Sequence, residues 1–126
     1  MNAGDTFQLA GAADRHLWII ISDPAIDPNQ VLFVNLTTYD PREDQTVVLN
    51  VGDHPFIQHR TCVSYSRARV ATNFQLEQLK NAQRLIPHAS VTAKLLQRLR
   101  DGAALSSRIK MGHLELLQNQ GLIEIK

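Results

Sequence analysis

Cysteine is almost absent from this chain of 126 residues, since Cys62 is the only one. A single thiol excludes an internal disulfide and a zinc site built on several thiolates, and it agrees with a reducing compartment. Long apolar runs are absent too, because the longest, Leu17 to Ile21, is far too short to span a bilayer. The N-terminus also lacks the basic-then-apolar layout of a signal peptide. We therefore expect a cytoplasmic protein that does not associate with membranes.

Linkers rich in Gly or Ser and internal repeats are also missing from the sequence. Apolar residues make up 44% of the chain and charged residues 20%, which is ordinary for a globular protein. A chain of this length can bury a core without metal or disulfide cross-links. The sequence thus predicts a single domain over residues 1–126.

The net charge of +1 hides an uneven distribution of charge along the chain. Most Lys and Arg residues lie from Arg60 onward, whereas most Asp and Glu residues precede it. A basic region of this kind is expected where a protein contacts a polyanion, and solvated helix faces give the same count. The distribution therefore permits nucleic-acid binding without requiring it.

The first half of the sequence predicts strands. Leu17–Ile21 and Val31–Leu36 are continuous apolar runs rich in β-branched residues, which is typical of strands buried on both faces. The segment between them carries Pro24 and Pro28 and indicates a turn. Shorter strands are expected at residues 5–9 and 46–49, with one or two more within 61–71.

From Asn73 onward the apolar residues recur at spacings of three and four, which predicts helices. The first helix is expected over 74–86, with Asn73 as N-cap and Pro87 as stop signal. The second follows Ser90 and ends at Gly102, and the third begins near Ser107. Strands followed by helices indicate an α+β fold, here a compact barrel at 4–72 with a helical extension at 73–126. Residues 122–125 could add an edge strand.

Three segments of the first half have the order and spacing of a known family. Gly4-Asp5-Thr6-Phe7, the segment from Arg15 to Pro24, and Val31–Leu36 followed by Thr37-Thr38 resemble the MazF/PemK toxin family over about residues 4–72. The resemblance implies a small SH3-like antiparallel β-barrel of about five strands that cleaves single-stranded RNA without metal. It also implies an antitoxin as protein partner.

The resemblance carries over to individual residues in part. Thr37 occupies the position of the family's Thr after the strand at Val31–Leu36. Where the family places an Arg, usually followed by Pro, this sequence has His16, with Arg15 one residue earlier. The catalytic Arg is thus either Arg15 in a shifted register, replaced by His16, or lost together with the activity.

The residues themselves, apart from any family, include groups that could carry out RNA cleavage. Cleavage through the 2′-hydroxyl needs a base, an acid, and a cation or hydrogen-bond donors for the charge that develops on phosphorus. Imidazole titrates near neutrality, and the loop at 52–60 contains two His and an Arg. We therefore predict that six catalytic residues line one groove at the barrel rim: Arg15, His16, Thr37, His54, His59 and Arg60.

Other interpretations of these residues remain open. His54 can belong to a turn and pack on Phe56, and Thr37 can be an ordinary strand-end residue. His88 and His113 lie in the predominantly helical second half of the chain and are expected at the surface. No pair among the His residues has the tight spacing of a metal-ligand motif, so no metal or other cofactor is expected.

Two further function classes compete with a toxin-like endoribonuclease. The missing Arg-Pro favours a non-catalytic SH3-like interaction module that binds a partner protein or forms a homodimer. A nucleic-acid-binding accessory protein would use only the basic second half.

Overall fold

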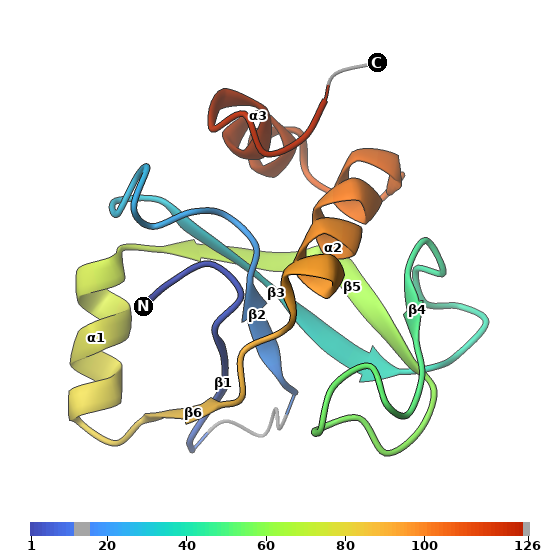
Figure 1. The fold of residues 1–126 in the computed structure, drawn as a ribbon, viewed down its shortest axis with the longest axis horizontal. Coiled ribbons are helices and arrows are strands. Elements are labelled where there is room, and N and C mark those ends of the chain that lie inside the picture. The colour runs from blue at the N-terminus through green and yellow to red at the C-terminus, as the bar shows by residue number, and fades with distance from the viewer. Residues whose placement is uncertain (12–15, 125–126) are drawn as a thin grey trace.

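The computed structural model describes residues 1–11 and 16–124. In this part of the chain, strands form one antiparallel sheet in the order β4-β5-β3-β2-β1-β6, and three helices pack against it (Figure 1). The strands are β1 (Thr6–Leu9), β2 (Trp18–Ile20), β3 (Val31–Thr38), β4 (Val48–Leu49), β5 (Thr61–Ala71) and β6 (Leu85–His88). The helices are α1 (Asn73–Asn81), α2 (Ala93–Leu105) and α3 (Met111–Asn119). The predicted α+β class is confirmed.

The sheet is open, so the predicted SH3-like barrel is not confirmed. The two edge strands, β4 and β6, do not pair with each other in the described part of the chain. β4 has only 2 residues, so it offers few backbone groups for pairing with a further strand. β6 contains Pro87, which has no N–H to donate and belongs on an edge. Both edges therefore resist closure.

Alternating side chains of the central strands form two separate cores. In β3, Val31 and Phe33 face one side of the sheet, whereas Leu32, Val34 and Leu36 face the other. The side of Phe33 also holds the rings of Phe7 and Trp18, each in an edge-on contact with it. Both faces are covered, which is why these runs contain hardly any polar residue.

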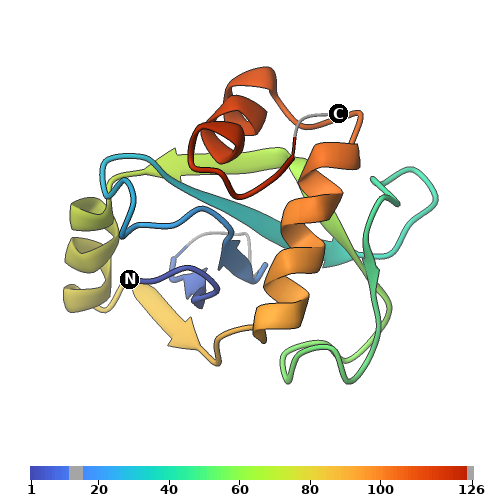
Figure 2. The same ribbon diagram turned by 45° about the horizontal axis from the view of Figure 1, so that its top comes forward.

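The helices divide between these two faces. Leu76 of α1 is buried in the core of Phe33, and α2 and α3 cover the opposite face with Leu99, Leu116 and others (Figure 2). Trp18, Ile20 and Phe33 are buried together with Leu76 in one core. Val34 lies in the other core, since β3 is buried on both sides. None of the helices in residues 1–11 and 16–124 is long and apolar enough to cross a membrane.

The helix predicted over 74–86 ends early. A capping box between Thr72 and Gln75 begins α1, which stops at Asn81. Gln83 then has a φ of 59°, a left-handed conformation that turns the chain back. The next residues form β6, which pairs with β1 at the edge of the sheet. The segment predicted as a helical extension thus contributes a strand.

Two other local predictions were wrong. Gly102 does not end α2, which continues to Leu105 and begins after Thr92 as N-cap. Leu122 and Ile123 lie in a bend that packs on the core and do not form an edge strand. Ile125 lies outside the described residues.

A buried carboxylate fastens the loop between β3 and β4 to the end of α2. Asp44 accepts hydrogen bonds from the Ser106 hydroxyl at 2.6 Å and from the hydroxyl and N–H of Thr46. Burial raises the pKa of Asp44, but the hydrogen bonds from Ser106 and Thr46 outweigh it, so the pKa lies below its ordinary value. The carboxylate is therefore ionised at neutral pH.

Candidate functional site

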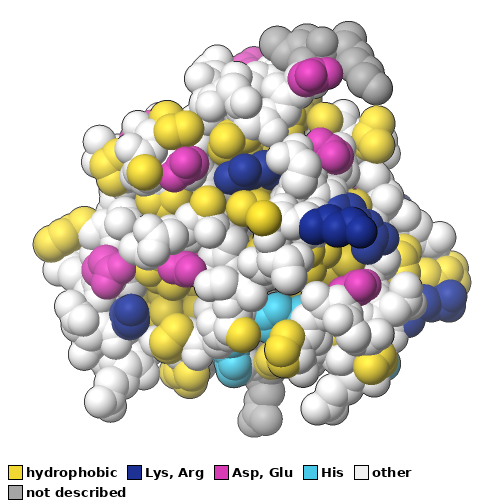
Figure 3. Space-filling view, viewed as in Figure 1, with side chains coloured by type: hydrophobic (Ala, Val, Ile, Leu, Met, Phe, Trp, Pro, Cys, Tyr) yellow, Lys and Arg dark blue, Asp and Glu magenta, His cyan; other side chains and the backbone are white. Residues whose placement is uncertain are grey.

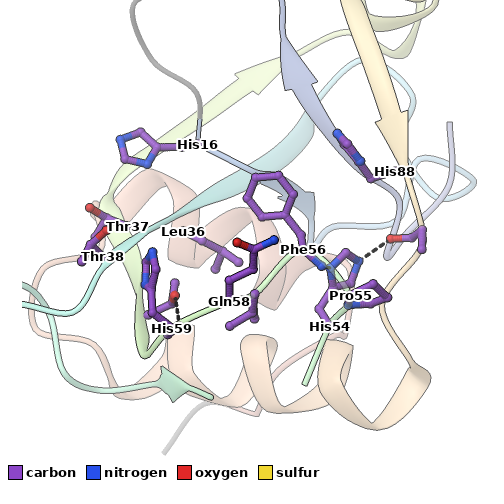
Figure 4. A pocket seen from close by; sticks show the side chains of 13 residues that line it. His16, Leu36, Thr37, Thr38, His54, Pro55, Phe56, Gln58, His59 and His88 are labelled. Carbon is purple, nitrogen blue, oxygen red and sulfur yellow. Dashed lines mark hydrogen bonds between the residues drawn. The ribbon is translucent and has the colours of Figure 1, made fainter. Parts of the chain in front are cut away.

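A pocket of about 550 Å³ opens beside the ends of β3 and β6 (Figure 4). Its walls come from three places: the end of β3, the loop at 54–59, and the end of β6. His16, just before β2, completes the lining. The residues that line it are His16, Leu36, Thr37, Thr38, His54, Pro55, Phe56, Ile57, Gln58, His59, Thr61, His88 and Ala89. Figure 3 shows histidine side chains reaching the surface beside hydrophobic ones.

Four of the six predicted catalytic residues line this pocket: His16, Thr37, His54 and His59. They come from loops and strand ends up to 43 positions apart in the sequence, since β3 pairs with β5 and brings Thr37 beside Cys62. The antiparallel sheet thus places the start of β2, the end of β3 and the loop before β5 at the same end of their strands, as the sequence suggested.

His54 is held on both sides of its ring. Its side chain is buried, with 5% of the residue exposed. The Phe56 N–H donates to Nδ1 at 3.0 Å, so Nδ1 carries no proton, and Nε2–H donates to the carbonyl of Ala89 at 2.6 Å. Neither nitrogen is left to exchange a proton with a ligand. His54 therefore positions the loop at 54–59 against the end of β6, which is the turn-like role that competed with catalysis.

His59 lies at the exposed end of the same loop. Its Nδ1 is 3.2 Å from the carbonyl oxygen of Arg60, which makes Nδ1 the protonated nitrogen of the neutral ring. The carbonyl of His59 accepts a hydrogen bond from the Thr61 hydroxyl at 2.8 Å, which fixes the backbone at the start of β5. Nε2 is then the nitrogen that can take up or deliver a proton.

The prediction that Arg60 lines the groove was wrong. Its guanidinium lies over the Tyr39 ring, 3.7 Å from the centroid, and the Tyr39 N–H donates to its carbonyl. Arg60 is accordingly not among the residues that line the pocket. Arg15 lies outside the described residues.

Several lining residues were not predicted as site residues, His88 and Gln58 among them. His88 was assigned to a helix surface but lies in β6, where its Nε2 is 2.8 Å from Oε1 of Gln8. Its ring contacts Phe56 edge-on, with centroids 5.5 Å apart. Gln58 also lines the pocket. Pro87 was the sequence signal that could have indicated an edge strand at His88, because an edge strand tolerates proline as readily as a helix end does.

The electrostatics of the pocket depend on its imidazoles. Among its described lining residues there is no Asp, Glu, Lys or Arg, whereas four are His. Each protonation therefore adds positive charge without a carboxylate nearby in the lining to cancel it. The described residues also contain no group of three or more His, Cys, Asp or Glu side chains arranged to hold a metal ion.

Comparison of the chain with protein-family models, curated proteins and solved structures found no match. The MazF/PemK resemblance therefore depends on the segments quoted above.

Proposed function

We propose that this protein is a toxin-like, RNA-directed endoribonuclease that cleaves through the 2′-hydroxyl without a metal ion. The observation that carries the proposal is the meeting of His16, His59 and the two hydroxyls of Thr37 and Thr38 in one pocket whose described lining contains no carboxylate. A phosphodiester is an anion, and a pocket of imidazoles and hydroxyls supplies donors to its oxygens without repelling it.

The proposed reaction uses two imidazoles. His16 takes the proton of the 2′-hydroxyl, and the 2′-oxygen attacks phosphorus. The bond from phosphorus to the 5′-oxygen breaks, and protonated His59 delivers a proton to that oxygen. The products are a 2′,3′-cyclic phosphate and a 5′-hydroxyl. Thr37 and Thr38 donate hydrogen bonds to the non-bridging oxygens, and His54 takes no part in proton transfer.

The remaining elements of the proposal come from the family resemblance. They are single-stranded RNA as substrate, an antitoxin as partner, and descent of the open sheet from an SH3-like barrel. Support for the last point is the long β5 strand of 11 residues, which pairs with both β3 and β4 and contains an irregularity opposite β3. Such an irregularity bends a strand.

The test is cleavage of labelled single-stranded RNA by the purified chain in the presence of EDTA. His16→Ala and His59→Ala should each lower the rate by roughly 10²–10⁴-fold, the usual contribution of a general acid or base. The matched control is His113→Ala, a His of α3 outside the pocket, which should cleave at the normal rate. The rate should also pass through a maximum with pH, because one imidazole must be neutral and the other protonated. Intact RNA, or cleavage that survives loss of both His residues, would refute the mechanism.

A second candidate function, binding of a partner protein, is favoured by an apolar cavity between α2 and the end of the chain. The cavity measures about 480 Å³, and its apolar lining includes Leu105, Leu114 and Ile123. Leu105 is 71% exposed, and Asp101 and Glu124 also line the cavity. The proposed partner is an amphipathic basic segment of an antitoxin.

Leu105→Asp tests this candidate, because a carboxylate in the cavity removes apolar contact without disturbing the buried core. The variant should stay folded and cleave RNA, yet lose inhibition by the proposed antitoxin. Light scattering tests the other possible occupant of this cavity, which is a second copy of the chain in a homodimer. Unaltered inhibition of Leu105→Asp would exclude the cavity as the binding site.

A further inference from the structure

The pocket has two parts that differ in chemistry (Figure 4). One part carries the hydroxyls of Thr37 and Thr38 together with the rings of His16 and His59. The other part is apolar and is formed by Pro55, Phe56 and Ile57. Figure 4 shows the Gln58 carboxamide near the centre of the pocket, between His59 and Phe56. Such a division suits a ligand with an anionic end and a flat apolar end, as a nucleotide has.

The apolar part is held in place from both sides. The ring of Phe56 contacts the ring of His88 edge-on, and Nε2 of His88 is hydrogen-bonded to Oε1 of Gln8 in β1. The backbone below is fixed by the Phe56 N–H on His54 and by the Ile57 N–H on the His54 carbonyl. The loop therefore presents an aromatic surface that needs little reordering when a ligand binds.

Gln58 follows this surface directly. It is exposed, and its carboxamide makes no hydrogen bond to any residue in the described part of the chain. A carboxamide has one acceptor oxygen and a donor nitrogen side by side. Its position beside an apolar surface therefore leaves a donor–acceptor pair facing the cavity.

We infer that Gln58 is a specificity-determining residue that selects adenine among the nucleobases, and this inference rests on the proposed function. The base lies against Phe56, as bases in single-stranded RNA commonly lie on aromatic rings. Oε1 of Gln58 accepts a hydrogen bond from the adenine N6 amino group, and Nε2 donates to adenine N7. Gln pairs with adenine in this way because N6 and N7 place a donor beside an acceptor on one edge of the base, whereas cytosine has only a C–H beside its N4 amino group on that edge. The pocket of about 550 Å³ lies in the range of sites that hold one small ligand.

The experiment measures base preference directly by titrating the full chain with 3′-AMP, 3′-CMP, 3′-GMP and 3′-UMP in one buffer, using calorimetry. The unchanged protein should bind 3′-AMP most tightly. Gln58→Glu keeps the size of the side chain but only accepts hydrogen bonds, so it should lose the preference for 3′-AMP over 3′-CMP by about 5- to 150-fold. Gln78→Glu, an exposed Gln on α1 outside the pocket, adds the same charge and should leave the preference unchanged.

The outcomes separate this inference from the proposed cleavage. If RNA stays intact while 3′-AMP binds best and the preference depends on Gln58, the inference stands and the cleavage fails. If RNA is cut but Gln58→Glu and Gln78→Glu have the same base preference, the inference is overturned and the cleavage stands. Absence of binding by all four nucleotides would also overturn it.

Discussion

Gly102 is the position where one added methyl group tests how closely α2 packs on the sheet. A Cβ atom placed on Gly102 would lie 2.3 Å from Cγ2 of Val47 and 2.4 Å from the hydroxyl oxygen of Tyr65. Val47 is 4% exposed and Tyr65 is fully buried, so neither side chain can move into solvent. The Tyr65 hydroxyl is also fixed by a hydrogen bond of 2.7 Å to the carbonyl of Leu99.

The magnitude follows from three opposing contributions to the free energy of unfolding. Alanine favours a helix over glycine by about 1 kcal/mol. Overpacking of a buried contact typically costs about 1–3 kcal/mol. Displacement of the Tyr65 hydroxyl leaves a buried polar group unsatisfied, which costs about 1–3 kcal/mol more. Gly102→Ala should therefore lower the free energy of unfolding by about 1–5 kcal/mol.

The measurement is urea-induced unfolding of Gly102→Ala beside a matched control. Gly112 lies in α3 with no atom within 4 Å of an added Cβ, so Gly112→Ala should gain up to about 1 kcal/mol from helix propensity alone. Val47→Ala should restore part of the loss when it is combined with Gly102→Ala, because it removes one of the two clashing groups. If Gly102→Ala were as stable as Gly112→Ala, the close approach of α2 to the sheet would be refuted.

Two further predictions concern the ties between distant segments. Ser106→Ala removes a hydrogen bond to the Asp44 carboxylate and should cost about 1.5–3 kcal/mol at pH 7, whereas exposed Ser107→Ala should stay within about 0.5 kcal/mol. Because the pKa of folded Asp44 is below its ordinary 3.8, this contribution is present above pH 3.8 and is lost as pH falls through the folded value, so urea unfolding of wild type and Ser106→Ala should converge in acid. His54→Ala frees the loop at 54–59, so hydrogen exchange at the Phe56 amide should accelerate and RNA cleavage should fall while the helices stay protected. Unchanged exchange at Phe56 would contradict the positioning role of His54.

Much of the sheet could be predicted from sequence because its central strands are buried on both faces. A run such as Val31–Leu36 admits few alternatives, and its end at Thr37 also located one wall of the pocket. The region after α1 could not be predicted in the same way. Leu85 and Ile86 continue the helical spacing of α1, and only the pairing with β1, a contact far along the chain, selects a strand there.

The candidate site was predicted from residue types. The prediction failed for residues whose side-chain direction determines whether they can act in the pocket. His16, Thr37 and His59 were placed in one pocket by the order of strands, which the sequence does indicate. Arg60 looked equivalent to His59, yet the Tyr39 ring holds it elsewhere. The role of His54 depends on the carbonyl of Ala89, 35 positions away, and no local pattern carries that information.

The bond from His54 to Ala89 also bears on when the pocket can form during synthesis. The ribosome delivers the chain from the N-terminus, and early segments can begin to fold before later ones emerge. His16, the end of β3 and the loop at 54–59 are all made before β6, but the wall that holds them, at His88 and Ala89, is made last. A nascent chain that ends before Ala89 thus contains both His residues of the proposed reaction, His16 and His59. It still lacks the carbonyl of Ala89 that fixes the loop at 54–59 and completes the pocket.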